Sequence, residues 1–233
     1  MDQLGPSNLP VHLGLILDGN RRWARSKGLP QLEGHRQGYN TLYDVAVHAI
    51  DLGIRYVTAY VFSTENWKRT EEEVGYLMDL VVWVAKHEVE KYVRQGLKVI
   101  FLGSRKRLSK KVLDAMAIAE FKTKDCTRGT LAVCLNYGGH MEISDGVARM
   151  ISDGVAVDDV TPELIYKYLY HPEVPELDLI IRTSGEKRLS NFMLWRAAYA
   201  ELYFTSVPWP AFTPADLDVA LAEFAKRQRR IGQ

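Results

Sequence analysis

The sequence predicts an α/β fold, in which a central, mostly parallel sheet has helices on both faces and a hydrophobic tunnel. Short runs rich in Val, Ile and Leu alternate along the chain with longer stretches of helical period. This alternation requires crossover connections, which make neighbouring strands parallel. The tunnel depends on residues 71–94, whose apolar arc is wider than one packing face. Core or dimer packing is the competing explanation of that arc.

Six apolar runs are predicted strands, because each is short, rich in branched residues and bounded by polar or turn-forming residues. They cover residues 13–17, 55–62, 97–102, 130–135, 177–181 and 201–204. The helices follow from helical periodicity and from capping signals such as Thr70 before three glutamates. They cover residues 36–51, 71–94, 109–121, 141–152, 162–168, 189–198 and 215–227. No repeat or linker divides the chain, so residues 1–233 are predicted to form one domain, with residues 1–10 flexible.

Composition excludes several classes of protein. Lys and Arg total 30 against 29 Asp and Glu, so the net charge gives no indication of nucleic-acid binding. The two cysteines, Cys126 and Cys134, form no CxxC pair, which argues against a zinc site or a disulfide framework. We find no secretory leader, and no apolar stretch approaches the roughly 18 residues that span a bilayer. A cytoplasmic protein is therefore predicted.

Polar clusters follow four of the predicted strands, at the point where each strand ends. They comprise residues 18–20, 63–66, 136–139 and 182–186. In an open parallel sheet the carboxyl ends of the strands share one edge, and ligands bind in the crevice there. The four clusters are therefore expected to converge on one site.

The first cluster suits a diphosphate. Gly19 permits a sharp turn, and backbone N–H groups before a helix can cradle a phosphate. Arg21 and Arg22 add positive charge. Asp18 is a poor neighbour for an anion unless Mg²⁺ bridges the two, and magnesium takes one or two carboxylates together with phosphate oxygens. Taken alone, the motif is better explained by an Asx turn with solvated arginines.

The second and fourth clusters add an apolar wall and more cations. Phe62 and Trp67 bracket hydroxyl, carboxylate and amide side chains, a combination that suits a ligand with an apolar tail and a charged head. Arg182 and Arg188 flank hydroxyls and a glycine, an arrangement suited to phosphate recognition. His35 is a further phosphate candidate. The nucleotide motifs GxxxxGK[ST] and GxGxxG are absent, so nucleotide binding loses support.

With these motifs the sequence resembles the cis-prenyltransferase family, which includes undecaprenyl diphosphate synthase, over residues 12–232. The matching segments are LDGNRRWA, EGHRQG, YVFSTENWKR, NYGG, IRTSGEKRLSNF, YAELYF and RRIG. The DDxxD motif of the trans-prenyltransferases is absent. The resemblance implies a transferase of prenyl (alkyl) groups. It would condense isopentenyl diphosphate with an allylic diphosphate such as farnesyl diphosphate, release diphosphate and leave a cis double bond.

The resemblance also implies a role for individual residues. Asp18 would be catalytic and would hold Mg²⁺, with Glu201 as the second carboxylate, and Asn66 would be the second catalytic residue, assigned to proton removal. The substrate-binding residues would be Gly19, Asn20, Arg21, Arg22, Trp23, Gln31, His35, Ser63, Thr64, Glu65, Trp67, Arg69, Arg182, Arg188, Leu189 and Ser190. The family is homodimeric, and Arg230 and Gly232 would complete a site. A long product implies transient contact with a membrane surface.

Two departures from the family pattern bear on the substrate. Gln31 stands where the family usually has Arg, and Val61 stands where long-chain members often have Ala in the strand beside the tunnel. Two other functions are weighed against the enzyme. A non-catalytic partner subunit of the same fold would lack Asp18, and a phosphatase would carry a nucleophilic Asp pair or a CxxxxxR loop.

Overall fold

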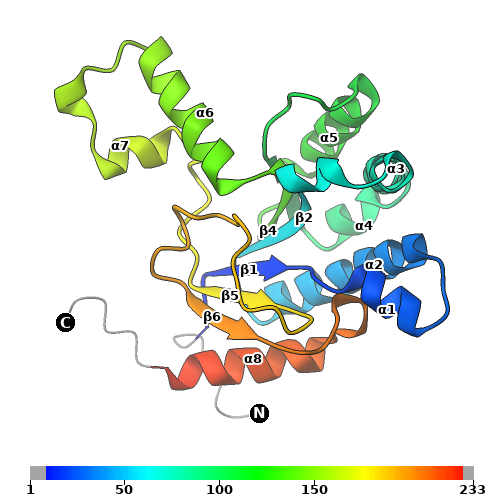
Figure 1. Ribbon diagram of the computed structural model, residues 1–233. Coiled ribbons are helices and arrows are strands. Elements are labelled where there is room, and N and C mark those ends of the chain that lie inside the picture. The colour runs from blue at the N-terminus through cyan, green and yellow to red at the C-terminus, as the bar shows by residue number, and fades with distance from the viewer. Residues whose placement is uncertain (1–8, 228–233) are drawn as a thin grey trace.

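A six-stranded sheet forms the centre of the protein in the computed structural model, which describes residues 9–227 (Figure 1). The strands are β1 (His12–Ile16), β2 (Tyr56–Ser63), β3 (Leu97–Leu102), β4 (Gly129–Tyr137), β5 (Leu179–Arg182) and β6 (Glu201–Phe204). Their order across the sheet is β3-β4-β2-β1-β5-β6, and every neighbouring pair is parallel. The predicted α/β class is confirmed, and the sheet is parallel throughout.

Helices connect successive strands from β1 to β5, as parallel pairing requires, whereas the non-helical residues 183–200 connect β5 to β6. The helices are α1 (Asn20–Ser26), α2 (Gln31–Asp51), α3 (Glu71–His87), α4 (Val89–Arg94), α5 (Lys110–Thr123), α6 (Gly139–Ser152), α7 (Pro162–Lys167) and α8 (Pro214–Lys226). Short 3₁₀ turns are η2 (Thr64–Lys68), η3 (Val157–Asp159) and η4 (Trp209–Ala211). The side chains of Thr70, Thr161 and Thr213 accept hydrogen bonds from the first turns of α3, α7 and α8, so the capping signals act as predicted.

The two faces of the sheet are covered differently. One face packs on α2, α3, α4, α5 and α8, and strand residues such as Leu15 and Val57 are fully buried there. The other face is covered largely by residues 174–200, where Phe192 and Met193 are fully buried against Ile180. Helices α6 and α7 project from the body at this side (Figure 1). The cover of the second face is therefore mainly non-helical.

The segment 189–198 was predicted to be a helix, and this prediction is wrong. Ser190, Asn191 and Met193 have positive φ angles of 51°, 65° and 39°, so the segment forms turns. A buried ion pair holds it: the guanidinium Nη1 of Arg196 lies 2.7 Å from Oε1 of Glu142, and both side chains are fully buried. The apolar residues of this segment have a helix-like spacing, but they belong to a loop that packs into the core.

Three other helical segments differ from the prediction by more than two residues. Helix α1 was not predicted, because its N-cap is Gly19, which supplies no side-chain cap. Helix α2 begins at Gln31 after Pro30, five residues before the predicted start at Arg36. The predicted helix 71–94 is two helices that meet at Glu88, whose φ of −115° breaks the helical course. Among residues 9–227, no helix has the length and apolar character needed to cross a bilayer.

Candidate active site

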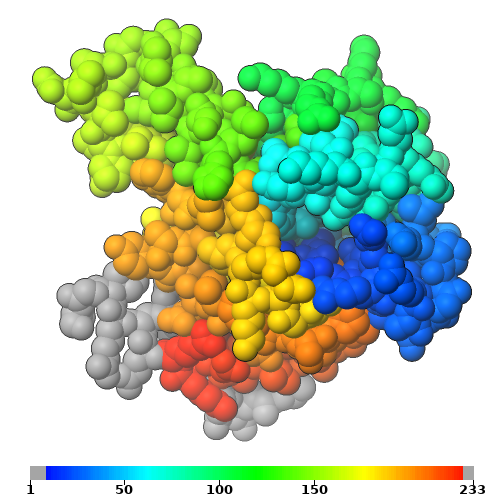
Figure 2. Space-filling model, viewed as in Figure 1, coloured from blue at the N-terminus to red at the C-terminus, as the bar shows by residue number. Residues whose placement is uncertain are grey.

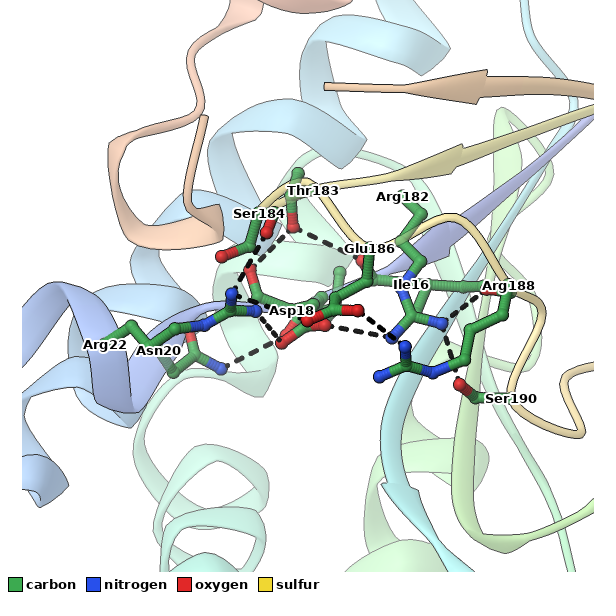
Figure 3. Close-up of polar contacts among 11 residues, drawn as sticks. Ile16, Asp18, Asn20, Arg22, Arg182, Thr183, Ser184, Glu186, Arg188 and Ser190 are labelled. Atoms are coloured by element: carbon green, nitrogen blue, oxygen red, sulfur yellow. Dashed lines mark hydrogen bonds and ion pairs between the residues drawn. The ribbon is translucent and has the colours of Figure 1, made fainter. Parts of the chain in front are cut away.

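Asp18 lies at the tip of β1 between two arginines that come from different parts of the chain (Figure 3). Its Oδ2 accepts a hydrogen bond from Nη2 of Arg182 at 2.9 Å, and its Oδ1 accepts one from Nη2 of Arg22 at 3.1 Å. The side chain is 27% exposed, so the carboxylate faces the crevice and is not sealed in the core. The predicted meeting of the first and fourth clusters at one site is what the structure shows.

Arg182 ends β5 and is 4% exposed, although it carries a positive charge. Its Nη1 donates to Oγ of Ser190 at 2.7 Å and to the backbone oxygen of Arg188. Its Nε has no hydrogen-bond partner among residues 9–227. Thr183 donates from Oγ1 to the backbone oxygen of Asp18 at 2.7 Å, which ties the tips of β5 and β1 together. A buried guanidinium held by three hydrogen bonds keeps further N–H donors with which it can bind an anion.

The turn after β1 requires glycine. Gly19 has a φ of 105°, and a Cβ there would lie 2.6 Å from Oγ of Ser184. Gly34 in α2 has a similar role, because its Cβ would lie 2.2 Å from the backbone oxygen of Asn20. Helices α1 and α2 therefore approach closely. The approach buries the Oδ1 of Asn20 without a hydrogen-bond partner among the described residues.

The turn after β2 is held by a capping box. Ser63 caps η2, and its backbone N–H donates to Oδ1 of Asn66 at 3.0 Å. Glu65 accepts a hydrogen bond from Nδ2 of Asn191 at 3.1 Å. Burial acts to raise the pKa of Glu65, but hydrogen bonds from its own N–H, Ser63 and Asn191 outweigh burial and lower the pKa below its ordinary value. Glu65 is therefore ionised at neutral pH.

A buried carboxylate gathers three basic side chains on the other side of the crevice. Oε1 of Glu73 lies 3.0 Å from Nε2 of His35 and 2.9 Å from Nη1 of Arg69, and Oε2 lies 3.6 Å from Nη1 of Arg21. Nε of Arg21 also donates to Oε1 of Gln31 at 3.1 Å. Burial lowers the pKa of His35 despite the opposing effect of Glu73. His35 is thus neutral at pH 7, and Glu73 positions the three basic side chains.

An apolar cavity of about 640 Å³ opens at this crevice. Figure 2 shows the surface hollowed where the blue α1 segment, the cyan α3 segment and the yellow loop after β5 meet. Polar residues at the cavity wall are Asp18, Asn20, His35, Ser63, Glu65, Asn66, Arg69, Arg182, Ser190 and Asn191. Apolar residues include Leu42, Val61, Leu77, Leu80, Val81, Val84, Ala85, Val89, Val99, Phe101, Leu131 and Val133. Charged groups on the strand tips therefore border an apolar interior.

Several predicted binding residues do not line this cavity. Gly19, Arg21, Arg22, Trp23, Gln31, Thr64, Trp67, Arg188 and Leu189 are outside its wall. Trp67 donates from Nε1 to Oδ1 of Asn136 at 2.7 Å and packs edge-on against Phe62. Leu189 packs with the core of the second sheet face. Trp67 and Leu189 therefore support the loops that carry the polar groups.

Glu201 does not lie beside Asp18 within one chain, so the two expected metal ligands do not form a pair there. Glu201 begins β6 and pairs with Leu179, which pairs with Leu13 at the start of β1. Five residues separate Leu13 from Asp18, which at about 3.3 Å per residue is roughly 16 Å along the strand direction. Oε2 of Glu201 instead accepts a hydrogen bond from Nη1 of Arg227 at 2.8 Å. Arg230 and Gly232 lie outside the described residues.

Sequence reasoning missed three residues of the site. Glu73 was assigned only to the capping of α3, yet it is 6% exposed and binds three basic side chains. Asn191 was placed in a helix, yet it joins Glu65 to the start of α6 through the backbone N–H of His140 at 2.9 Å. Tyr60 lines the cavity beside Val61, because β2 is irregular between Tyr60 and Phe62. The sequence does not indicate the irregularity of β2 at Tyr60. Glu73 and Asn191 could have been considered as candidates, because both are polar residues close to the predicted site.

The residues at the mouth fit a magnesium ion that takes most of its coordinating oxygens from a bound diphosphate and from water. Among residues 9–227 no group of three or more His, Cys, Asp or Glu side chains is placed to hold a metal. Magnesium, however, needs only one or two carboxylates when phosphate oxygens and water supply the rest. The partly exposed carboxylate of Asp18 meets that requirement.

Comparison with known proteins agrees with this geometry. Residues 16–232 match the Prenyltransf family model, described as undecaprenyl diphosphate synthase. An isoprenyl transferase of Thermotoga maritima is 47% identical over 227 residues, which cover 96% of this chain and 97% of the relative. A trans,polycis-polyprenyl diphosphate synthase of Thermobifida fusca, (2Z,6E)-farnesyl diphosphate specific, is 42% identical over 99% of this chain and 83% of the relative.

A solved structure is similar along the whole chain as well. Lavandulyl diphosphate synthase from Lavandula x intermedia, in complex with dimethylallyl diphosphate, superposes with a TM-score of 0.91 at 32% identity. The match covers 97% of this chain and all of that one. The prenyltransferase motifs, the all-parallel sheet and these matches agree, and the chain belongs to the cis-prenyltransferase family.

Proposed function

We propose that this protein condenses isopentenyl diphosphate with an allylic prenyl diphosphate, releases diphosphate and leaves a cis double bond. The observation that carries the proposal is the position of Asp18 and Arg182 at the mouth of an apolar cavity. The cavity suits a prenyl chain, and the charged mouth suits its diphosphate head. The names of the relatives, among them isoprenyl transferase and decaprenyl diphosphate synthase, support the same reaction.

The allylic substrate is proposed to bind with its head at α1 and its tail in the cavity. Gly19, Asn20 and Arg22 present backbone and side-chain donors at the start of α1, and His35 lies opposite. Arg22 is half-exposed and contacts the carboxylates of Asp18 and Glu186, which an incoming diphosphate would replace as its partner. Farnesyl diphosphate is the proposed primer. The apolar interior of the cavity is the proposed tunnel for the growing chain.

Isopentenyl diphosphate is proposed to bind on the loop after β5. Arg182 is fixed by Asp18 and Ser190, and Arg188 is 60% exposed and contacts Glu186 (Figure 3). The two arginines can grip two oxygens of one diphosphate. Because Arg182 touches both Asp18 and Ser190, the heads of both substrates would lie within one shared field of positive charge.

Asp18 is the residue that would hold Mg²⁺, through whichever carboxylate oxygen the arginines release. Bound there, the ion would neutralise charge on the allylic diphosphate. Arg22 and Arg182 would stabilise the same negative charge as the C–O bond breaks, because both guanidinium groups already point at the carboxylate. We therefore propose that the enzyme depends on magnesium and that Asp18 is the one carboxylate of this chain that binds the ion.

The reaction then balances in three steps. The allylic C–O bond breaks, and its electron pair leaves with diphosphate. The terminal alkene carbon of isopentenyl diphosphate attacks the allylic carbon, and a new C–C bond forms. A proton leaves the neighbouring carbon, and its bonding pair forms the new double bond. Asn66 is proposed to act at this last step from the cavity wall, where its Oδ1 accepts a hydrogen bond from the Ser63 backbone. The departing proton would pass to the released diphosphate.

A homodimer, a cytoplasmic location and transient contact with a membrane surface complete the proposal. Met141, Val147 and Ile151 are 41%, 41% and 74% exposed on one face of α6, which supports cover by a second copy of the chain. A product with a long apolar tail needs a lipid acceptor when it leaves the cavity.

One incubation tests the reaction. Purified protein with Mg²⁺, farnesyl diphosphate and labelled isopentenyl diphosphate should give label in material extractable into organic solvent, and chromatography should resolve chains longer by whole five-carbon units. Label that stays in water, with or without added detergent, would refute the proposed condensation. Release of inorganic phosphate without chain growth would instead indicate a phosphatase.

A further inference from the structure

Two hollows meet at one residue of α2, one helical turn beyond His35. The first is the apolar cavity described above. The second, of about 600 Å³, is a polar surface depression that we call the outer groove. It is lined by Gln37, Tyr39, Asn40, Tyr43, Asp44, Lys91 and Arg94. Tyr39 lines both hollows. Its ring is therefore the partition between the apolar interior and the water in the groove.

The register of the sheet shows that the cavity extends well beyond the charged mouth. At the mouth Ser63 pairs with Tyr137, whereas deeper in the cavity Leu131 pairs with Val57 and Val99. Six residues separate Leu131 from Tyr137, which corresponds to about 20 Å along the strands. Only two residues separate the end of α4 from the first residue of β3, so α4 lies at the deep end.

The partition is built from α2 and from the junction of α3 and α4. The hydroxyl of Tyr39 donates to Oε2 of Glu88 at 3.5 Å, and Glu88 also contacts the ammonium group of Lys91. The ring of Tyr43 lies edge-on to that of Tyr92, with 5.4 Å between centroids. Figure 1 shows α2 and α4 side by side. Burial raises the pKa of Tyr39, so the hydroxyl is a neutral donor to the Glu88 carboxylate.

We propose that the Tyr39 ring, held by Glu88, is a specificity-determining group that ends the space available to the product and so limits its length. The inference rests on the proposed function. A chain that grows from the mouth meets only apolar side chains until it reaches the hydroxyl and carboxylate of this partition. A further five-carbon unit must either displace the ring or enter the polar groove, and neither is favourable for a hydrocarbon.

The test is the product distribution of three variants against the wild type. Tyr39→Ala removes the ring and should shift the products longer by at least one five-carbon unit, while Tyr39→Phe keeps the ring and should leave the main product unchanged. Asn40→Ala is the matched control, because Asn40 lines only the outer groove, and its products should be those of the wild type. An active Tyr39→Ala enzyme with wild-type products would overturn the proposal.

Tyr39→Leu guards against a folding defect in the alanine variant. Leu favours helix and keeps this face of α2 apolar, yet it is shorter than Tyr. It should therefore lengthen the products in the same direction, and wild-type products from a folded Tyr39→Leu enzyme would equally overturn the proposal. A wild type that incorporates no isopentenyl diphosphate refutes the proposed function, whereas an active wild type whose Tyr39 variants make the same products refutes only the role of Tyr39.

Discussion

The carboxylate of Asp18 and the guanidinium of Arg182 lie 2.9 Å apart, although 164 residues separate them in the chain. Their contact joins the tips of β1 and β5, the two adjacent strands that carry the loops proposed for the two substrates. A change at either residue should therefore affect the binding of both diphosphates. The neighbouring strands also fix the spacing of the two loops, so catalysis here depends on the register of the sheet.

Asp18→Asn should lower kcat at least a hundredfold, which is about 3 kcal/mol of barrier. The amide keeps the size of the side chain but removes the charge proposed to hold Mg²⁺ and to orient Arg22 and Arg182. Steady-state kinetics with labelled isopentenyl diphosphate measures the loss. Asp79→Asn is the matched control, since that carboxylate is 70% exposed and contacts only the surface Lys111. Turnover near the wild-type rate in Asp18→Asn would contradict the assignment of Asp18.

Removal of divalent cations should abolish turnover without unfolding the protein. The described residues hold no cluster of metal ligands, so the fold is expected not to depend on a cation, whereas the diphosphate substrates require one. EDTA should stop condensation, and excess Mg²⁺ should restore it. EDTA saturated with Mg²⁺ beforehand is the control. The unfolding temperature of the substrate-free protein should be the same with and without EDTA; a large drop would reveal a structural metal that the proposal does not include.

Acid should destabilise the protein through His12, which is fully buried in β1. Its Nδ1 donates to the backbone oxygen of Pro175 at 2.8 Å, so its Nε2 accepts from the hydroxyl of Thr58 at 2.7 Å. Burial lowers the pKa of His12 to about 4 from the model-compound value of 6.5. The unfolded chain therefore binds this proton at a higher pH than the folded one. The stability is present above pH 6.5 and is lost as pH falls toward 4, by about 3 kcal/mol.

Urea unfolding at pH 7, 5 and 4 measures this effect in wild type and in His12→Gln. The free energy of unfolding is compared at each pH, and the wild type and the variant are compared in how much of it they lose. This comparison is needed because other groups, including the buried His35, titrate in both proteins. The wild type should lose about 3 kcal/mol more than the variant between pH 7 and 4. His140→Gln, at an exposed position, should follow the wild type. Parallel curves for wild type and His12→Gln would show that His12 is not the buried neutral group described.

Local sequence patterns predicted the strands well and the irregular loops poorly. All six strands and the convergence of polar residues at their carboxyl ends could be predicted, because alternation of apolar runs with helical stretches leaves few possible topologies. The loop 189–198 could not, since its apolar residues pack in a core whose position depends on the distant Glu142. The same holds at the site. Asp18 and Arg182 were recognised from their motifs, whereas the distance between Asp18 and Glu201 depends on pairing register, which no local pattern specifies.

Arg196→Leu should destabilise the protein by about 3–5 kcal/mol, because removal of one partner leaves the buried carboxylate of Glu142 uncompensated. Arg196 also donates to the backbone oxygens of Val174 and Tyr170, so the loop that carries Ser190 should loosen. Thermal and urea unfolding measure the loss, and the KM for isopentenyl diphosphate should rise with it.

Two further variants identify the cause of that loss. Arg128→Leu breaks the exposed pair with Asp51 and should cost less than about 1 kcal/mol. Adding Glu142→Gln to Arg196→Leu removes the uncompensated charge while keeping an acceptor for the backbone N–H of Tyr170, so the double variant should recover part of the stability. Equal stability of the single and double variants would mean that lost packing, and not the buried charge, accounts for the effect.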